Sequence, residues 1–208
     1  MPAPRRLEAH AAAGAEVGDP PDPAGAAALG ALRSLRAVRR FTDQPVDARD
    51  LDRVLEAGRW TGSARNRQPW RVVVVRDPRA RAELARLGAY AGHLAGAPVV
   101  LLLALDTAAG GTDGEFDTGR LAQTLMLAAA ALGLGTCPVT FFPDANVARA
   151  TAIAGRAAPW RVRTGIALGH PAPPAPWAGR EGRPAIPTGR RPLAEFRVDP
   201  GDLPDVRA

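Results

Sequence analysis

The sequence of 208 residues predicts one α+β domain with a central sheet and helices packed against it. Short runs of β-branched and aliphatic residues alternate along the chain with longer segments whose apolar residues recur at helical spacing. The length, with 46% hydrophobic residues, suffices for one sizeable core and stays near the upper size of a single domain. The alternation fits an α+β or a three-layer α/β arrangement.

The two ends of the chain differ in composition from its middle. Most of the first thirty residues are Ala, Gly or Pro without sustained apolar periodicity, so residues 1–30 are expected to form a flexible tail. The domain is expected to span residues 31–200, and residues 201–208 form a C-terminal tail. Within the domain, the Pro- and Gly-rich stretch 169–192 cannot hold a long helix and is expected to run extended over a surface.

The first half of the domain predicts two helices and two strands. Asp47 resembles a helix cap, and apolar residues at helical spacing follow it. The run WRVVVVR, residues 70–76, predicts a strand. Asp77 then begins a helix over about residues 78–87, because proline favours the first helical position. PVVLLLALD, residues 98–106, predicts a second, buried strand.

The second half repeats this alternation. Asp117 is expected to cap a helix over residues 118–132, which a glycine ends. TCPVTFF, residues 136–142, predicts a third strand, and a short helix over about residues 145–154 follows. RVRTGIALG, residues 161–169, predicts the fourth strand.

The charged and metal-binding residue types exclude several classes of chemistry. The net charge of +6 comes entirely from arginine, because the chain contains no lysine. This excludes a Walker-type phosphate loop and lysine Schiff-base chemistry. A single Cys137 excludes an internal disulfide and a Cys-based zinc site, and the three histidines lack metal-binding spacing, so no metal is expected.

Membrane and dinucleotide-binding patterns are also missing. The longest apolar stretches are too short to cross a bilayer, and the N-terminus lacks the apolar centre of a signal peptide. A cytoplasmic protein without membrane contact is therefore expected. Gly133 and Gly135 form G-x-G, but they follow a helix and Pro138 occupies the third glycine position, which excludes a dinucleotide-binding fold here. The G-x-S-x-G motif that carries the nucleophilic serine of many hydrolases does not occur, so serine hydrolysis has no nucleophile at a recognisable place.

A loop of small polar residues, WTGSARNRQPW, directly precedes the first strand. Its backbone and amide groups stand open where the strand begins, which indicates a ligand contact. The residues concerned are Thr61, Gly62, Ser63, Asn66 and Gln68.

Two arginine clusters lie near the ends of the domain. The first is Arg36, Arg39 and Arg40, and the second is Arg190 and Arg191. One hypothesis is an anion held between the clusters, because the planar guanidinium pairs with phosphate oxygens through two hydrogen bonds. For any single arginine, a solvated surface charge is the alternative.

From about residue 31 to 197 the chain resembles the FMN-dependent nitroreductase family, through five segments in the same order. They are LRAVRRFTDQPVDARDLDRVLEAGRWTGSARNRQPWRVVVV, LAGAPVVLLLAL, FDTGRLAQTLMLAAAALGLGTC, GIALGHP and RRPLAEF. The resemblance implies a nitroreductase-like α+β fold of three layers, α/β/α, with a central mixed sheet flanked by helices. It also implies an obligate homodimer whose loop before N-x-Q-P-W reaches the flavin site of the other subunit.

The same resemblance implies which residues bind FMN. Arg36 and Arg39 match basic positions near the phosphate, and Arg190 or Arg191 matches a C-terminal basic position. The backbone at Thr140 and Phe141 matches the position beside flavin N5. The implied cofactor-binding set is Arg36, Ala37, Arg39, Thr61, Gly62, Ser63, Asn66, Gln68, Thr140, Phe141, Arg190 and Arg191. Three positions depart from the family, since Leu35, Ala37 and Phe141 stand where Arg, Ser and Gly are common.

The function implied is an oxidoreductase that uses NAD(P)H to reduce FMN and then a nitroaromatic or quinone acceptor by a ping-pong cycle. No catalytic side chain is expected, because the flavin carries the hydride. The side chain of Phe141 either enters the core or stands at the pocket mouth, since strand alternation sends Phe141 and Phe142 to opposite faces. A flavin-binding store or sensor without turnover is one alternative. A nucleic-acid binder is another, which interleaved acidic residues disfavour.

Overall fold

The computed structural model describes residues 22–173 and 189–199. The chain divides after Ala172 into two units, and each is considered by itself. The strands are β1 (Trp70–Val75), β2 (Val99–Asp106), β3 (Gly135–Thr140) and β4 (Trp160–Gly169). The helices of the first unit are α1 (Pro23–Ser34), α2 (Ala48–Arg59), α3 (Pro78–Leu84), α4 (Thr107–Gly110), α5 (Gly114–Ala131) and α6 (Asp144–Ile153), with the 3₁₀ turns η1 (Ala64–Asn66), η2 (Gly92–Leu94) and η3 (Gly111–Asp113). The second unit holds α7 (Leu193–Phe196).

The four strands form one sheet in the order β1-β2-β4-β3, so β1 and β3 are its edges. All three neighbouring pairs are antiparallel. The expectation of a mixed sheet is therefore wrong for the described strands. The reason is visible between β1 and β2: Val75 pairs with Val100, so the connecting segment returns to the end of the sheet that it left. A parallel pairing occurs only as a single bridge between Ala37 and Thr136 within the described residues.

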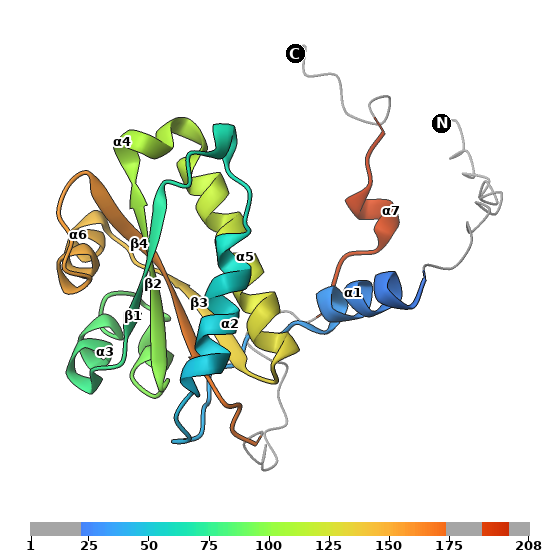
Figure 1. Cartoon of the computed structure of the whole chain (residues 1–208), viewed down its shortest axis with the longest axis horizontal. Coiled ribbons are helices and arrows are strands. Elements are labelled where there is room, and N and C mark those ends of the chain that lie inside the picture. Colours follow the sequence, from blue (N-terminus) through green and yellow to red (C-terminus); the bar gives the residue numbers. More distant parts are fainter. Residues whose placement is uncertain (1–21, 174–188, 200–208) are drawn as a thin grey trace, which may run out of the picture. The chain divides into compact units, whose positions relative to one another are not determined.

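Helices cover both faces of this sheet, which confirms the three-layer α+β prediction (Figure 1). Successive residues of β2 point to opposite faces of the sheet, as in any β-strand. Leu101 and Leu103 pack with α2 and α5, through residues such as Val54 and Leu125. Val100, Leu102 and Ala104 point to the layer that contains α3 and α6.

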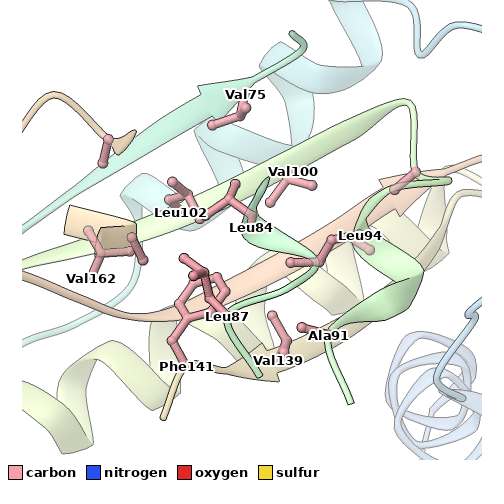
Figure 2. Packing of buried hydrophobic residues seen from close by; sticks show 14 of the residues in the cluster. Val75, Leu84, Leu87, Ala91, Leu94, Val100, Leu102, Val139, Phe141 and Val162 are labelled. Atoms are coloured by element: carbon pink, nitrogen blue, oxygen red, sulfur yellow. The ribbon is translucent and has the colours of Figure 1, made fainter. Parts of the chain in front are cut away.

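Figure 2 shows the hydrophobic core on the face of the sheet that α3 and α6 cover, where large side chains from the sheet meet those from the covering segments. Leu84 of α3 and Leu94 of η2 are fully buried there with Leu102 of β2. Phe141, one residue beyond β3, is also fully buried. None of the helices in the described ranges is long and apolar enough to cross a membrane.

Two helices differ from the sequence prediction: α5 begins earlier than expected, and α1 forms where a flexible tail was expected. Helix α5 begins at Gly114, and Asp117 does not cap it. A side chain at Gly114 would come within 3.0 Å of Leu105, so the glycine permits a close helix–strand contact that outweighs its poor helix propensity.

Helix α1 occupies Pro23–Ser34, part of the expected N-terminal tail. The Asp22 side chain accepts a hydrogen bond from the Gly25 amide, and Pro23 takes the first helical position, so capping and an alanine-rich composition favour the helix. None of its side chains is buried. Residues 1–21, the C-terminal tail 201–208 and most of the stretch 169–192 lie outside the described residues.

Candidate functional site

The polar loop between α2 and β1, residues 61–68, has an unusual backbone. Arg65, Asn66 and Gln68 have φ angles of 54°, 53° and 47°. This left-handed region is disfavoured for residues with a side chain, and each such residue costs about 1–3 kcal/mol unless its surroundings fix it. Such conformations cluster at functional sites.

Hydrogen bonds within the loop fix this shape. The backbone N–H of Gln68 donates to the Ser63 hydroxyl oxygen at 2.8 Å, and the backbone N–H of Asn66 donates to the Ser63 carbonyl at 2.9 Å. The Gln68 side-chain nitrogen donates to Asn66 Oδ1 at 2.9 Å. Three of the residues predicted to contact a ligand therefore also shape the loop. The Ser63 hydroxyl proton remains available as a donor.

The loop is also tied to the segment that begins α5. The Ala64 amide donates to the buried carboxylate of Asp117 at 2.8 Å. Arg67 Nη1 donates to the Gly110 carbonyl at 3.0 Å and lies 3.5 Å from the Asp113 carboxylate. Sequence reasoning missed this role of Asp117, because its partner lies 53 residues away in the chain.

The first arginine cluster lies beside the opposite edge of the sheet. The Val38 amide donates to the Thr136 carbonyl at 2.8 Å, and Ala37 bridges to the same residue of β3. A Cβ on Gly135 would come within 2.7 Å of the Val38 side chain, so glycine is required for this close approach. Arg36 is exposed, and its Nη1 donates to the Arg33 and Leu35 carbonyls.

A cavity of about 430 Å³, here called the β3-edge cavity, opens beside this segment. Pro138 and Thr140 are exposed on the strand that borders it, whereas Val139 between them is buried. Its polar and aromatic lining includes Arg39, Tyr90, His93, Thr140 and Phe142. A larger cavity of about 510 Å³ lies between α6 and the start of β4, but it is lined by none of the predicted site residues.

Phe141 and Phe142 face opposite ways, as strand alternation requires. Phe141 is fully buried, so its side chain belongs to the core and does not stand at the mouth of the pocket. Its amide donates to the Arg163 carbonyl at 2.8 Å, so the N–H expected beside flavin N5 is already bonded within the sheet. Phe142 is 76% exposed and lines the β3-edge cavity. Phe142, rather than Phe141, is thus the aromatic side chain at this cavity.

Burial sets the protonation states near this cavity. Desolvation lowers the pKa of His93, against a smaller opposing effect of the nearby Cys137 and Tyr90 backbone, so its imidazole is neutral at pH 7. Burial raises the pKa of the Cys137 thiol, which is therefore protonated. Two buried polar atoms have no partner in the described residues at the two places of interest: His93 Nε2 at the cavity and Thr61 Oγ1 in the loop. Such atoms are rare in native proteins, and either a bound water or a ligand can supply the partner.

The two parts of the candidate site lie at opposite edges of the sheet. The loop leads into edge strand β1, whereas Arg39 and Thr140 lie at edge strand β3. Three strand spacings separate these edges, roughly 14 Å. One chain therefore does not bring the two parts together. Arg190 and Arg191 belong to the second unit, so the structure leaves their distance from Arg36 and Arg39 undefined.

Exposed aromatic side chains accompany both parts. Tyr90 and Phe142 line the β3-edge cavity, Trp60 directly precedes the loop in the chain, and Phe116 directly precedes Asp117, the residue bonded to the loop. Trp60 Nε1 donates to Glu56 at 3.0 Å, and the Arg59 guanidinium lies 5.0 Å from the centre of its ring. Hydrogen bonds from Arg59 and Trp60 lower the pKa of Glu56 to about 2. Aromatic side chains are enriched where protein surfaces contact other molecules.

The chain matches known proteins over most of its length. The model of the nitroreductase family matches residues 32–91 and 86–170. A crystal structure of a protein from Desulfovibrio desulfuricans, named as a nitroreductase in complex with FMN, is 32% identical with a TM-score of 0.68, covering 82% of this chain and 95% of that one. A protein from Parabacteroides distasonis, named as an NADH dehydrogenase/NAD(P)H nitroreductase, has a TM-score of 0.71 at 21% identity over 82% of this chain and 96% of that one, which supports the fold.

Two sequence relatives add to this. A Thermus thermophilus protein named NADH dehydrogenase is 44% identical over 69 residues, which span 33% of this chain and 34% of that protein. A protein from Methanothermobacter thermautotrophicus, named as an NADH dehydrogenase/NAD(P)H nitroreductase, is 27% identical over 141 residues, 65% of this chain and 72% of that protein. Since the family model covers well over half of the chain and the fold agrees, the chain belongs to the nitroreductase family.

Proposed function

We propose that the protein is an FMN-dependent oxidoreductase that works as a homodimer and uses NAD(P)H to reduce small acceptors, nitroaromatics and quinones among them. The observation that carries the proposal is that the two parts of the candidate site lie at opposite sheet edges, and that each contains a buried polar atom without a partner among the described residues. A relative 32% identical to this chain is described in complex with FMN.

The residues present fit the chemistry of FMN. Arg36 and Arg39 supply cations for the phosphate, and an arginine guanidinium retains free donors even when one nitrogen is engaged. Thr61 Oγ1 and His93 Nε2 offer hydrogen bonds to the polar edges of a flavin ring. A symmetric dimer would bring the two parts of the site together, because a two-fold axis can place the loop of each copy at the β3-edge cavity of the other. Two equal sites then form.

The chain's own residues then bind, orient and exclude water. FMN, when bound, supplies the hydride chemistry, so no side chain needs to act as nucleophile or general base. Arg39 holds the phosphate at the β3 edge, and the loop residues Thr61 and Gln68 fix the ring. Tyr90 and Phe142 narrow the mouth of the cavity and favour flat aromatic molecules. NAD(P)H and the acceptor use this mouth in turn, which gives ping-pong kinetics.

The visible spectrum and the mass of the purified protein test this function. We expect a yellow dimer with one FMN per subunit, whose colour bleaches when NADH or NADPH is added without oxygen. A colourless protein that takes up no added FMN, or a monomer that holds flavin, contradicts the proposal. A yellow dimer that neither cofactor bleaches is a flavin store or sensor instead.

A further inference from the structure

Asp117 is a buried acid in a position that its own helix does not explain. It lies in the first part of α5, and its side chain is only 4% exposed. Burial of a carboxylate is unfavourable unless hydrogen bonds and charges compensate. Its close partner is the Ala64 amide at 2.8 Å, whereas Arg120 lies 3.5 Å away and is itself half exposed. The buried carboxylate is thus directed at the loop.

The Ala64 amide stands at the start of the strained turn. The next residues are Arg65 and Asn66, both left-handed, and Gln68 follows with the same strain. The bonds among Ser63, Asn66 and Gln68 close the turn on itself, but they do not fix it to the rest of the molecule. Its anchors are Arg67, which reaches the Gly110 carbonyl at a partly buried site, and Asp117. Of the two anchoring side chains, Asp117 is the buried one.

We propose that Asp117 is a positioning residue, whose carboxylate holds loop 61–68 in the one shape that presents Thr61, Asn66 and Gln68 to the flavin of a second copy. This inference rests on the proposed function. A carboxylate suits the role because charge-assisted hydrogen bonds to a backbone amide are about twice as strong as neutral ones. Pre-organisation of the loop then removes an ordering cost from FMN binding.

The first test uses the FMN-free protein, so it does not depend on the proposed function. The chain has no lysine, so trypsin cleaves it only after arginine, and Arg65 and Arg67 lie in the loop itself. In Asp117→Ala, cleavage after these two residues should be about ten- to a hundredfold faster, the factor that loss of a charge-assisted hydrogen bond gives. Fragment masses identify the cleaved bonds.

Two variants make the comparison specific. Asp117→Asn keeps an oxygen that can accept from the Ala64 amide, and it should restore most of the resistance. Glu115→Ala removes the same charge two residues away, but Glu115 is paired with Arg161 at 2.9 Å, and no hydrogen bond or ion pair among the described residues joins it to the loop, so cleavage should match the wild type. Equal loop cleavage in Asp117→Ala and Glu115→Ala overturns the inference.

FMN titration of the same variants completes the test. Asp117→Ala should weaken FMN binding about tenfold or more, Asp117→Asn much less, and Glu115→Ala not at all. Faster loop cleavage with unchanged FMN affinity overturns the positioning role. A wild-type protein that binds no FMN overturns the proposed function, while the cleavage result still decides whether Asp117 anchors the loop.

A third measurement applies if Asp117→Ala does not fold. Hydrogen exchange at the Ala64 amide in the wild-type protein should be slow, because its acceptor is buried. Exchange at the rate of an open loop overturns the inference without any variant.

Discussion

At the scale of residues, two adjacent aromatics and two nearby arginines have separate roles. Phe141 belongs to the core and Phe142 to the β3-edge cavity. Arg39 lines that cavity, whereas Arg40 next to it does not. Because neighbouring residues of an extended segment point in opposite directions, a shift of one position changes the role of a side chain completely. Variants at adjacent positions therefore serve as matched pairs.

The phenylalanine pair gives the first such prediction. Phe141→Ala should lower the free energy of unfolding by about 3–5 kcal/mol, since it empties a fully buried aromatic site. Phe142→Ala should leave stability nearly unchanged and raise the rate with bulky acceptors relative to small quinones, because it widens the mouth of the cavity. Denaturant unfolding and steady-state rates with one small and one bulky quinone measure both effects. A large stability loss in Phe142→Ala, with the acceptor ratio unaltered, contradicts this division.

The arginine pair tests the phosphate contact. Arg39→Ala should weaken FMN binding about ten- to a hundredfold, because a hydrogen bond to a charged group contributes roughly 1.5–3 kcal/mol. Arg36→Ala should act in the same direction to a smaller extent. Arg40→Ala is the control and should bind FMN as the wild type does. An equal loss in Arg39→Ala and Arg40→Ala would mean that overall charge, and not a specific contact, attracts the cofactor.

At the scale of elements, the position of the arginine segment depends on Gly135 of β3. Val38 packs directly over this glycine, where a side chain would come within 2.7 Å. The hydrogen bond from Val38 to Thr136 holds the segment to the strand, and Arg36 and Arg39 flank that contact. Any side chain at position 135 therefore pushes the segment and its arginines away from the strand.

Gly135→Ala should accordingly lower the free energy of unfolding by about 1–3 kcal/mol and weaken FMN binding as well. Gly119→Ala, at an open position of α5, is the matched control and should be neutral or stabilising by up to about 1 kcal/mol, because alanine favours helices. Thermal unfolding and FMN titration of both variants check this. Normal FMN affinity in Gly135→Ala would show that the arginine segment does not depend on the close contact.

The elements also show what the sequence predicts and what it does not. Apolar runs and helical spacing predicted the four strands and the helices after Asp47 and Asp77, because these signals are local. The predicted start of α5 was wrong, because a tertiary contact between Gly114 and Leu105 outweighs the poor helix propensity of glycine. The antiparallel pairing and the bond from Ala64 to Asp117 join residues far apart in the chain, and periodicity carries no information on such partners.

The residues of the candidate site divide in the same way. Residue type alone suggests a phosphate or amide contact, so the sequence predicts the arginine segment and the polar loop as site segments. The structure places them at the two parts of the candidate site. The sequence left open whether Phe141 enters the core or stands at the pocket mouth, because the phase of the strand was not known; the structure places Phe141 in the core. No pattern in the sequence indicated that Tyr90 and His93 line the site, because only the path of the chain from β1 to β2 brings them to the β3 edge.

At the scale of the whole molecule, we propose that each flavin site takes one part from each copy. The loop at β1 and the cavity at β3 are separated by the width of the sheet within one chain. Exposed aromatic residues at both edges agree with two contact regions that meet across a symmetry axis. Mutations in the two parts should therefore complement each other when they lie in different subunits.

A mixed dimer measures this directly. One subunit carries Arg36→Ala and Arg39→Ala, and the other, with a different tag, carries Thr61→Ala and Gln68→Ala. In the mixed dimer one site combines both damaged parts, but the other combines two intact ones. FMN binding is titrated at concentrations where neither mutant homodimer retains the cofactor. We predict one tightly bound FMN per mixed dimer; no bound FMN would contradict the shared site, since every site built within a single chain would then carry one damaged part.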